Sequence, residues 1–278
     1  MNVRLEDNEK KNKSLKIFYV SIVVICVIAI ITAVVIQIIK ENSNKNTLDD
    51  NKLQEYKAKF NSVFQNKINY LENNNYKITK VDNSKEIVYV GYEEKKSKVS
   101  DYNLNVCIPY INIDNEVIRK YNNEIKDVFE QTAKDVLNSR NQNIVYTVTY
   151  SAYVTNNILS LVIRSTLKQG ENPQRDMVQT YNYDLTNKKE CTFEDMLNLK
   201  KISRQQANST ILSEIKKVEK QVNERAELGY SVYKRNSSDS MYNVDNITEF
   251  FLGEDDVLYV IFAYGNQNQT NEMDIVVM

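Results

Sequence analysis

The stretch YTVTYSAYVTNNILSLVI, residues 146–163, decides the fold of the larger part of this chain. Apolar or aromatic side chains alternate with mostly polar ones from Tyr146 to Val154 and resume from Leu159 to Ile163. A period of two is typical of β-strands that bury one face. Asn156 and Asn157 separate the two runs, and asparagine tolerates the positive φ of a tight turn. The stretch therefore predicts an antiparallel β-hairpin.

Further strands are predicted on both sides of this hairpin. The strand-like stretches are 76–81, 87–92, 99–108, 177–185, 247–252, 257–264 and 273–277. We expect Pro109 to end the third of them, because proline lacks the N–H that a strand ladder uses.

Two amphipathic helices interrupt the strands. The first can be capped by Asp114 or Asn115 and carries an apolar stripe over 117–136. The second begins near Ser203, which can form a capping box with Gln206. The order of strands, helix, strands, helix and strands predicts an α+β fold with antiparallel sheets and two main amphipathic helices.

The N-terminal region contains one long apolar segment, IFYVSIVVICVIAIITAVVIQII, which runs from Ile17 to Ile39 without a charge. Roughly 20 apolar residues suffice for a helix to cross a bilayer. The segment exceeds a signal-peptide core, and no small-residue cleavage site follows it. We therefore predict a single transmembrane helix before the α+β domain. Five Lys or Arg residues precede it, which favours a cytoplasmic N-terminus and an extracytoplasmic C-terminal domain in the cell membrane.

The predicted organisation has four parts. Residues 1–16 form a short cytoplasmic tail, 17–39 the transmembrane helix, and 40–75 a tether with a membrane-proximal helix over 53–71. Residues 76–278 form the extracytoplasmic domain, with a possible subdivision near 190–200.

Composition excludes several classes of function. The chain has no histidine, so Ser-His-Asp or Cys-His hydrolysis and His-ligated zinc are ruled out. It also lacks the glycine-rich phosphate-binding motifs. Beyond position 40 it carries 30 basic and 34 acidic residues, which argues against nucleic acid as a partner. We predict no catalytic residue, cofactor or metal site.

The two cysteines outside the apolar segment and the acidic run 254–256 each have two interpretations. Cys107 and Cys191 can form a disulfide in an exported domain, or they can be two buried free thiols. The acidic run 254–256 can attract calcium, but an exposed hairpin turn is favoured because the spacing of a calcium-binding loop is absent.

Four pieces in order resemble an exported bacterial domain family of unknown function. They are the strand ending in Ile108-Pro109-Tyr110, the hairpin ending in Ile158-Leu159-Ser160, TYNYDLTNKKECTFEDML (180–197) and EFFLGEDDVLYVIF (249–262). That family includes the outer part of the lysozyme-sensing anti-sigma-V factor RsiV and the non-catalytic N-terminal region of a membrane-anchored peptidoglycan deacetylase. This chain departs from the family after the last hairpin, where it has AYGNQNQTNEMD, residues 263–274.

The resemblance implies a binding or sensing module that faces the cell wall of a Gram-positive-type bacterium. Its ligand would be peptidoglycan, a muramidase or another envelope protein. The resemblance does not imply deacetylase activity, because the catalytic domain of such enzymes uses histidine ligands. An anti-sigma-like regulator that responds to lysozyme or envelope stress is the alternative. A carboxylate-dependent cell-wall enzyme is a weaker one.

Overall fold

The computed structural model describes residues 50–70, 76–140 and 143–278. The predicted tail and the predicted transmembrane segment from Ile17 to Ile39 lie outside these residues. Among the helices that are described, none combines the length and apolarity needed to cross a membrane.

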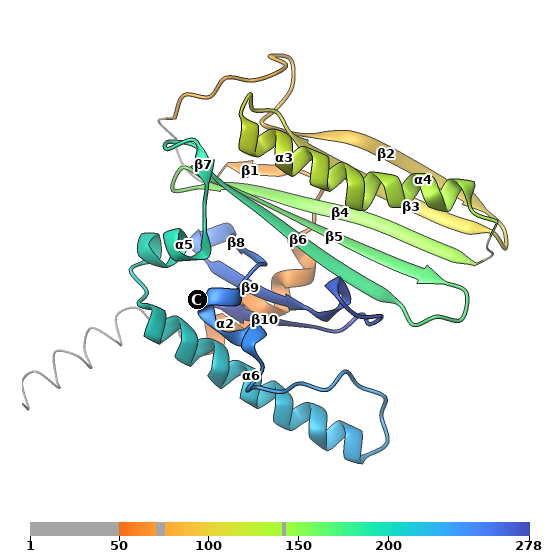
Figure 1. The fold of residues 1–278 in the computed structure, drawn as a ribbon, viewed down its shortest axis with the longest axis vertical. Coiled ribbons are helices and arrows are strands. Elements are labelled where there is room, and N and C mark those ends of the chain that lie inside the picture. Colours follow the sequence, from red (N-terminus) through yellow and green to blue (C-terminus); the bar gives the residue numbers. More distant parts are fainter. Residues whose placement is uncertain (1–49, 71–75, 141–142) are drawn as a thin grey trace, which may run out of the picture. The chain divides into compact units, whose positions relative to one another are not determined.

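A large mixed sheet runs through the middle of the domain (Figure 1). Its order is β2-β3-β4-β5-β6-β7, and β1 pairs with β4 off this path. The strands are β1 (Ile68–Tyr70), β2 (Val88–Lys98), β3 (Tyr102–Ile111), β4 (Ile144–Thr155), β5 (Ile158–Gln169), β6 (Arg175–Asp184) and β7 (Lys189–Glu190). The predicted hairpin is confirmed as β4 and β5, with φ of 51° at Asn156 and 61° at Asn157.

The prediction of purely antiparallel pairing is wrong for this sheet. Both β1 and β3 pair with β4 in parallel. In the case of β3 the reason is the helical segment between it and β4, which carries the chain back before the next strand starts. An alternating pattern indicates a strand but does not specify which neighbour it pairs with.

Two local predictions on the N-terminal side of the sheet are also wrong. Residues 76–81 form no strand. Pro109 does not end β3, which continues to Ile111. Pro109 pairs with Val90 beside a β-bulge, and the described pairs of β3 with β4 stop at Val106. A proline is tolerated at such a bulge, where the ladder is already interrupted.

One face of the large sheet is covered by α3 (Glu116–Ile125) and α4 (Gln131–Asn138), joined by a π-helical segment over Lys126–Glu130 (Figure 1). Asn115 is the N-cap, since its side chain accepts a hydrogen bond from Val117 N at 2.8 Å. The predicted apolar stripe is buried here with the alternate residues of β4, such as Tyr146 and Val148. This is the first hydrophobic core of the domain.

The opposite face of the large sheet packs on a small antiparallel sheet of order β10-β9-β8. Its strands are β8 (Phe250–Leu252), β9 (Leu258–Ala263) and β10 (Met273–Val277). The far side of the small sheet packs on α5 (Phe193–Lys200) and α6 (Arg204–Glu227) to form a second core. The predicted capping box of Ser203 and Gln206 is confirmed at the start of α6.

Polar side chains join the two sheets. Backbone N–H groups on the free edge of β8 bond to the hydroxyls of Ser160 and Thr180, at 3.1 Å from Leu252 N and 3.0 Å from Phe250 N. Ser160 also donates to Asn182 Oδ1 at 2.7 Å. Buried main-chain groups need partners, so these polar residues on β5 and β6 replace the strand that β8 lacks on this side.

The segment before residue 76 differs from its prediction. The helix α2 (Asp50–Lys59) ends well before residue 71, and β1 follows it. The Phe60 ring is buried against Phe251 and Tyr259 of the small sheet. Within the described ranges, residues from 50 onward belong to one compact unit, which includes α2 and β1. Near the predicted subdivision at 190–200, the chain passes from the first core, whose buried residues end at Leu185, to the second, which takes most of its residues from Cys191 onward.

Candidate ligand-binding pocket

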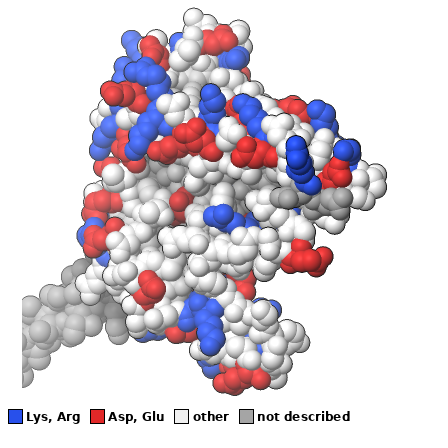
Figure 2. Space-filling view, turned by 45° about the vertical axis from the view of Figure 1, so that its right-hand side comes forward, with Lys and Arg blue, Asp and Glu red and all other residues white. Residues whose placement is uncertain are grey.

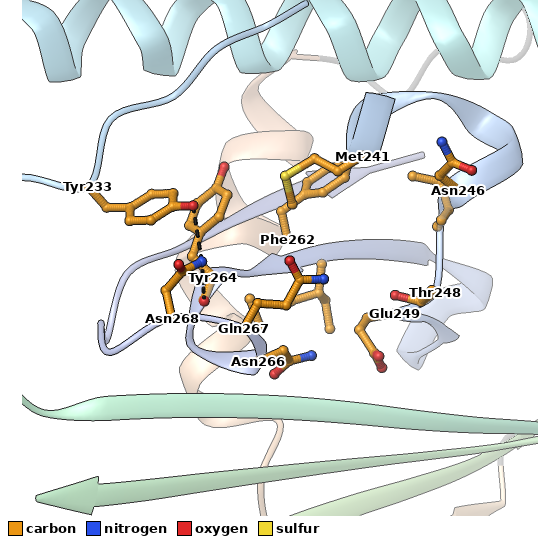
Figure 3. Close-up of a pocket in the computed structure, with 13 residues that line it drawn as sticks. Tyr233, Met241, Asn246, Thr248, Glu249, Phe262, Tyr264, Asn266, Gln267 and Asn268 are labelled. Carbon is orange, nitrogen blue, oxygen red and sulfur yellow. Dashed lines mark hydrogen bonds between the residues drawn. The ribbon is translucent and has the colours of Figure 1, made fainter. Parts of the chain in front are cut away.

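A small pocket lies where the small sheet meets the free edge of β6, with a volume of about 110 Å³ (Figure 3). Amide, hydroxyl and carboxyl side chains supply one part of its lining, and aromatic or apolar side chains supply the rest. The polar residues are Asn246, Thr248, Glu249, Asn266, Gln267 and Asn268. The others are Tyr233, Met241, Ile247, Ile261, Phe262, Ala263 and Tyr264.

A 3₁₀ turn over Tyr264–Asn266 positions the amides of the pocket against β6. The side chain of Asn266 accepts from Val178 N at 3.0 Å and donates to Val178 O at 2.8 Å, which imitates a neighbouring strand. Gly265 permits this approach, because a Cβ there would lie 1.8 Å from Asp176 O. Arg175 fastens the turn by donating to the carbonyls of Gly265 and Asn266.

Gln267 presents the amide with the greatest freedom to meet a ligand. In Figure 3 it lies between Asn266 and Met241 in the middle of the pocket. Its side chain is exposed and makes no hydrogen bond to any residue that the structure describes. The neighbouring Asn268, by contrast, donates to Tyr233 Oη at 3.1 Å and to Tyr264 O at 3.3 Å.

Glu249 is the half-buried carboxyl group of the pocket. Its Oε2 accepts hydrogen bonds from Thr180 N at 2.7 Å and from Thr180 Oγ1 at 3.2 Å. Burial raises the pKa of Glu249 to about 7, against the opposing effect of the hydrogen bonds from Thr180. Within the described part of the chain no Lys or Arg forms an ion pair with it. The group therefore changes charge near neutral pH.

A buried polar network holds the aromatic wall of the pocket. Tyr264 Oη donates to Asp274 Oδ2 at 2.5 Å and lies 2.7 Å from Tyr242 Oη. Asp274 also accepts two hydrogen bonds from Arg235, at 2.9 and 3.0 Å. Burial, followed by the charge of Asp274, raises the pKa of Tyr264. The Tyr233 ring stacks on Tyr264 with 4.5 Å between centroids, so the network fixes both rings.

The residues singled out from sequence lie away from this pocket. Cys107 packs against the first core and Cys191 in the second, and both are free thiols, so the disulfide alternative is not what the structure shows. In the acidic turn, Asp256 accepts from Lys200 Nζ at 2.6 Å and Asn156 Nδ2 at 2.7 Å, which fits a structural turn. No cluster of potential metal ligands occurs among the described residues.

Sequence reasoning missed the pocket, although the segment 263–274 stands out as a departure from the resembled family. That segment supplies three of the lining amides, and the run GNQNQTN was the available signal. Glu249 had no local signal, because its partner Thr180 is 69 positions away.

Fold and pocket together define a mixed α+β domain with a small pocket of amides and aromatic rings. No protein-family model matches the sequence, and no curated protein matches it. Two solved structures of DUF3298 family proteins are similar. The one from Pseudomonas aeruginosa PAO1 has 10% identity and a TM-score of 0.38, covering 73% of this chain and 90% of that chain.

The second, from Bacteroides fragilis NCTC 9343, has 14% identity and a TM-score of 0.34, covering 63% of this chain and 81% of that chain. The structural neighbours are thus members of a domain family named as a DUF.

Proposed function

We propose that this protein is a non-catalytic binding or sensor protein that faces the bacterial cell wall, anchored in the membrane by residues 17–39. Its ligand is the glycan of the wall, which it recognises through an N-acetylated sugar in the pocket. The observation that carries the proposal is the exposed Gln267 amide beside Met241 and Phe262. An acetamido group needs both surfaces, because its amide forms hydrogen bonds while its methyl group contacts apolar atoms.

We propose a non-catalytic role because of the number of carboxyl groups in the pocket. Hydrolysis of a glycosidic bond by carboxylates uses two of them, about 5–10 Å apart, on either side of the bond. Among the described residues that line the pocket, Glu249 is the one acidic side chain. A single carboxyl group can accept or donate a hydrogen bond to a bound sugar, which suits a binding role.

The surface charge fits a neutral ligand. On the face shown in Figure 2, acidic and basic side chains are interspersed, and they are sparser across the middle. Such a surface offers no extended basic stripe for a polyanion on this face.

The test is an isothermal calorimetric titration of the full chain in detergent with soluble N-acetylglucosamine oligomers. We expect binding, and we expect Gln267→Ala to weaken it about tenfold because a buried hydrogen bond to the ligand is lost. Gln205→Ala, on an exposed position of α6, is the matched control and leaves the affinity unchanged. Equal affinities for the two variants, or no binding at about 10 mM sugar, contradict the proposal.

A further inference from the structure

A second hollow follows the free edge of β10 and has a volume of about 580 Å³. Among the described residues, none that lines it also lines the amide pocket. Val218 and Gln221 of α6 form one side of it. Asn61, which follows Phe60, and Arg164 of β5 form the other side, and Arg164 Nη1 donates to Asn61 Oδ1 at 2.7 Å. Met273 and Ile275 of β10 also line it.

The backbone of β10 is paired on one edge. Leu258 and Met278 exchange two hydrogen bonds of 3.0 and 2.9 Å, and Tyr264 N donates to Glu272 O at 3.3 Å. These bonds involve Glu272 and Met278, so the even-numbered residues face β9. Because successive residues of an antiparallel strand point their N–H and C=O groups to opposite edges, those of the odd-numbered residues point away from β9. The outward groups in the hollow are those of Met273 and Ile275.

These outward groups form a short row of alternating donors and acceptors. Within the described ranges, no hydrogen bond joins the outward groups of Met273 or Ile275 to another residue. An alternating row at this spacing is complementary to the backbone of an extended peptide, which is the basis of strand addition. A sugar or a nucleic acid does not repeat donors and acceptors at this spacing.

The position of the edge favours a single strand over a second copy of the domain. The edge lies between α6 and the α2 segment, and Lys57 of α2 pairs with Glu214 of α6 at the hollow. Two copies that paired through β10 would have to bring both sets of flanking helices together. One extended chain needs only about 5 Å beside the edge.

The arginine side chains that line the hollow indicate which charge a bound peptide should carry. Arg164 is paired with Asp176 at 2.7 Å, and Arg235 is paired with Asp274. Arg225 also lines the hollow, is exposed, and has no ion pair with a described residue. The Arg225 guanidinium lies over the Tyr230 ring, 5.8 Å from its centroid, and a carboxylate on the incoming peptide would add an ionic partner.

We propose that this hollow binds an extended peptide segment of a partner protein. The segment adds as a fourth strand to the small sheet beside β10. An acidic side chain of the segment pairs with Arg225.

The probe is a dye-labelled, acetylated hexapeptide of alternating threonine and valine that ends in aspartate, with anisotropy measured on the full chain in detergent. Two further versions carry N-methyl groups on the odd or on the even amides. Strand pairing uses one of these two sets, so we expect one version to lose about tenfold in affinity while the other binds like the parent. Equal affinities of the two versions, or no binding of the parent at about 1 mM, overturn the proposal.

Three variants locate the site. Gln221→Trp fills the hollow from an exposed helix position, and we expect at least about tenfold weaker binding. Lys216→Trp, exposed on the same helix outside the hollow, is the control and leaves the affinity within about twofold. Arg225→Glu favours a lysine-ended peptide over the aspartate-ended one. Unchanged binding in Gln221→Trp, or a dimer of the chain that this variant abolishes, overturns the assignment to a peptide.

Discussion

Replacing Glu249 with glutamine tests the electrostatics of the amide pocket. Glutamine keeps an oxygen that accepts the hydrogen bonds from Thr180 but removes the charge. The folded chain raises the pKa of Glu249 from 4.5 to about 7, so the folded state binds the proton more tightly than the unfolded state. The wild-type free energy of unfolding therefore falls as the pH rises from about 4.5 to about 7.

The size of this effect follows from the two pKa values. One unit of pKa corresponds to about 1.4 kcal/mol, so the difference sets an upper limit of about 3 kcal/mol. Because the side chain is half-buried and solvent screens it, we expect about 1–2 kcal/mol. Glu249→Gln should therefore be more stable than the wild type by this amount at pH 8 and similar to it near pH 4.5.

The assay is urea unfolding of the full chain in detergent, followed by the near-ultraviolet circular dichroism of its tyrosines at several pH values. Glu171→Gln is the control, because Glu171 is an exposed loop residue and its replacement should keep the wild-type pH dependence. The reasoning is refuted if Glu249→Gln keeps the same fall in stability between pH 4.5 and 8. It is also refuted if this variant is less stable than the wild type at pH 8.

Three further predictions concern packing and thiols. Ser160→Ala should lower the free energy of unfolding by about 1–3 kcal/mol, measured by urea unfolding, because it leaves Leu252 N without its partner between the sheets. Phe60→Ala should lower it by about 3–5 kcal/mol in the same assay, and hydrogen exchange should show faster exchange in α2. Cys191 should resist iodoacetamide in the native protein, because burial raises the pKa of its thiol to about 12. Cys107, which is less buried, should react faster. Mass spectrometry under non-reducing conditions that found the two cysteines linked would contradict this prediction.

Local patterns predicted the elements whose boundaries depend on neighbouring residues. The alternation over 146–163 located β4, its turn and β5. The alternative caps Asp114 and Asn115 located the start of α3, where Asn115 is the N-cap, and Ser203 located the start of α6. In each case the deciding interactions are a few positions apart. The same reasoning located β10 at Met273–Val277.

Predictions failed where a distant partner decided the conformation. Apolar spacing over 53–71 indicated one helix, but the helix ends at Lys59. Phe60 then packs against Phe251 and Tyr259 of the small sheet, and β1 pairs with β4. Pro109 remained within β3 because a bulge in β2 faces it. Neither partner is visible within a short window of sequence.

The sequence by itself determined the α+β class, the hairpin and the two amphipathic helices. Only the tertiary structure decided the parallel pairing of β1 and β3 with β4, the capping of the β6 edge by Asn266 and Glu249, and thereby the pocket. The physical reason is the range of the interactions. Periodicity and caps act between residues a few positions apart, whereas the pocket joins Thr180 to Glu249 and Val178 to Asn266 across 69 and 88 positions.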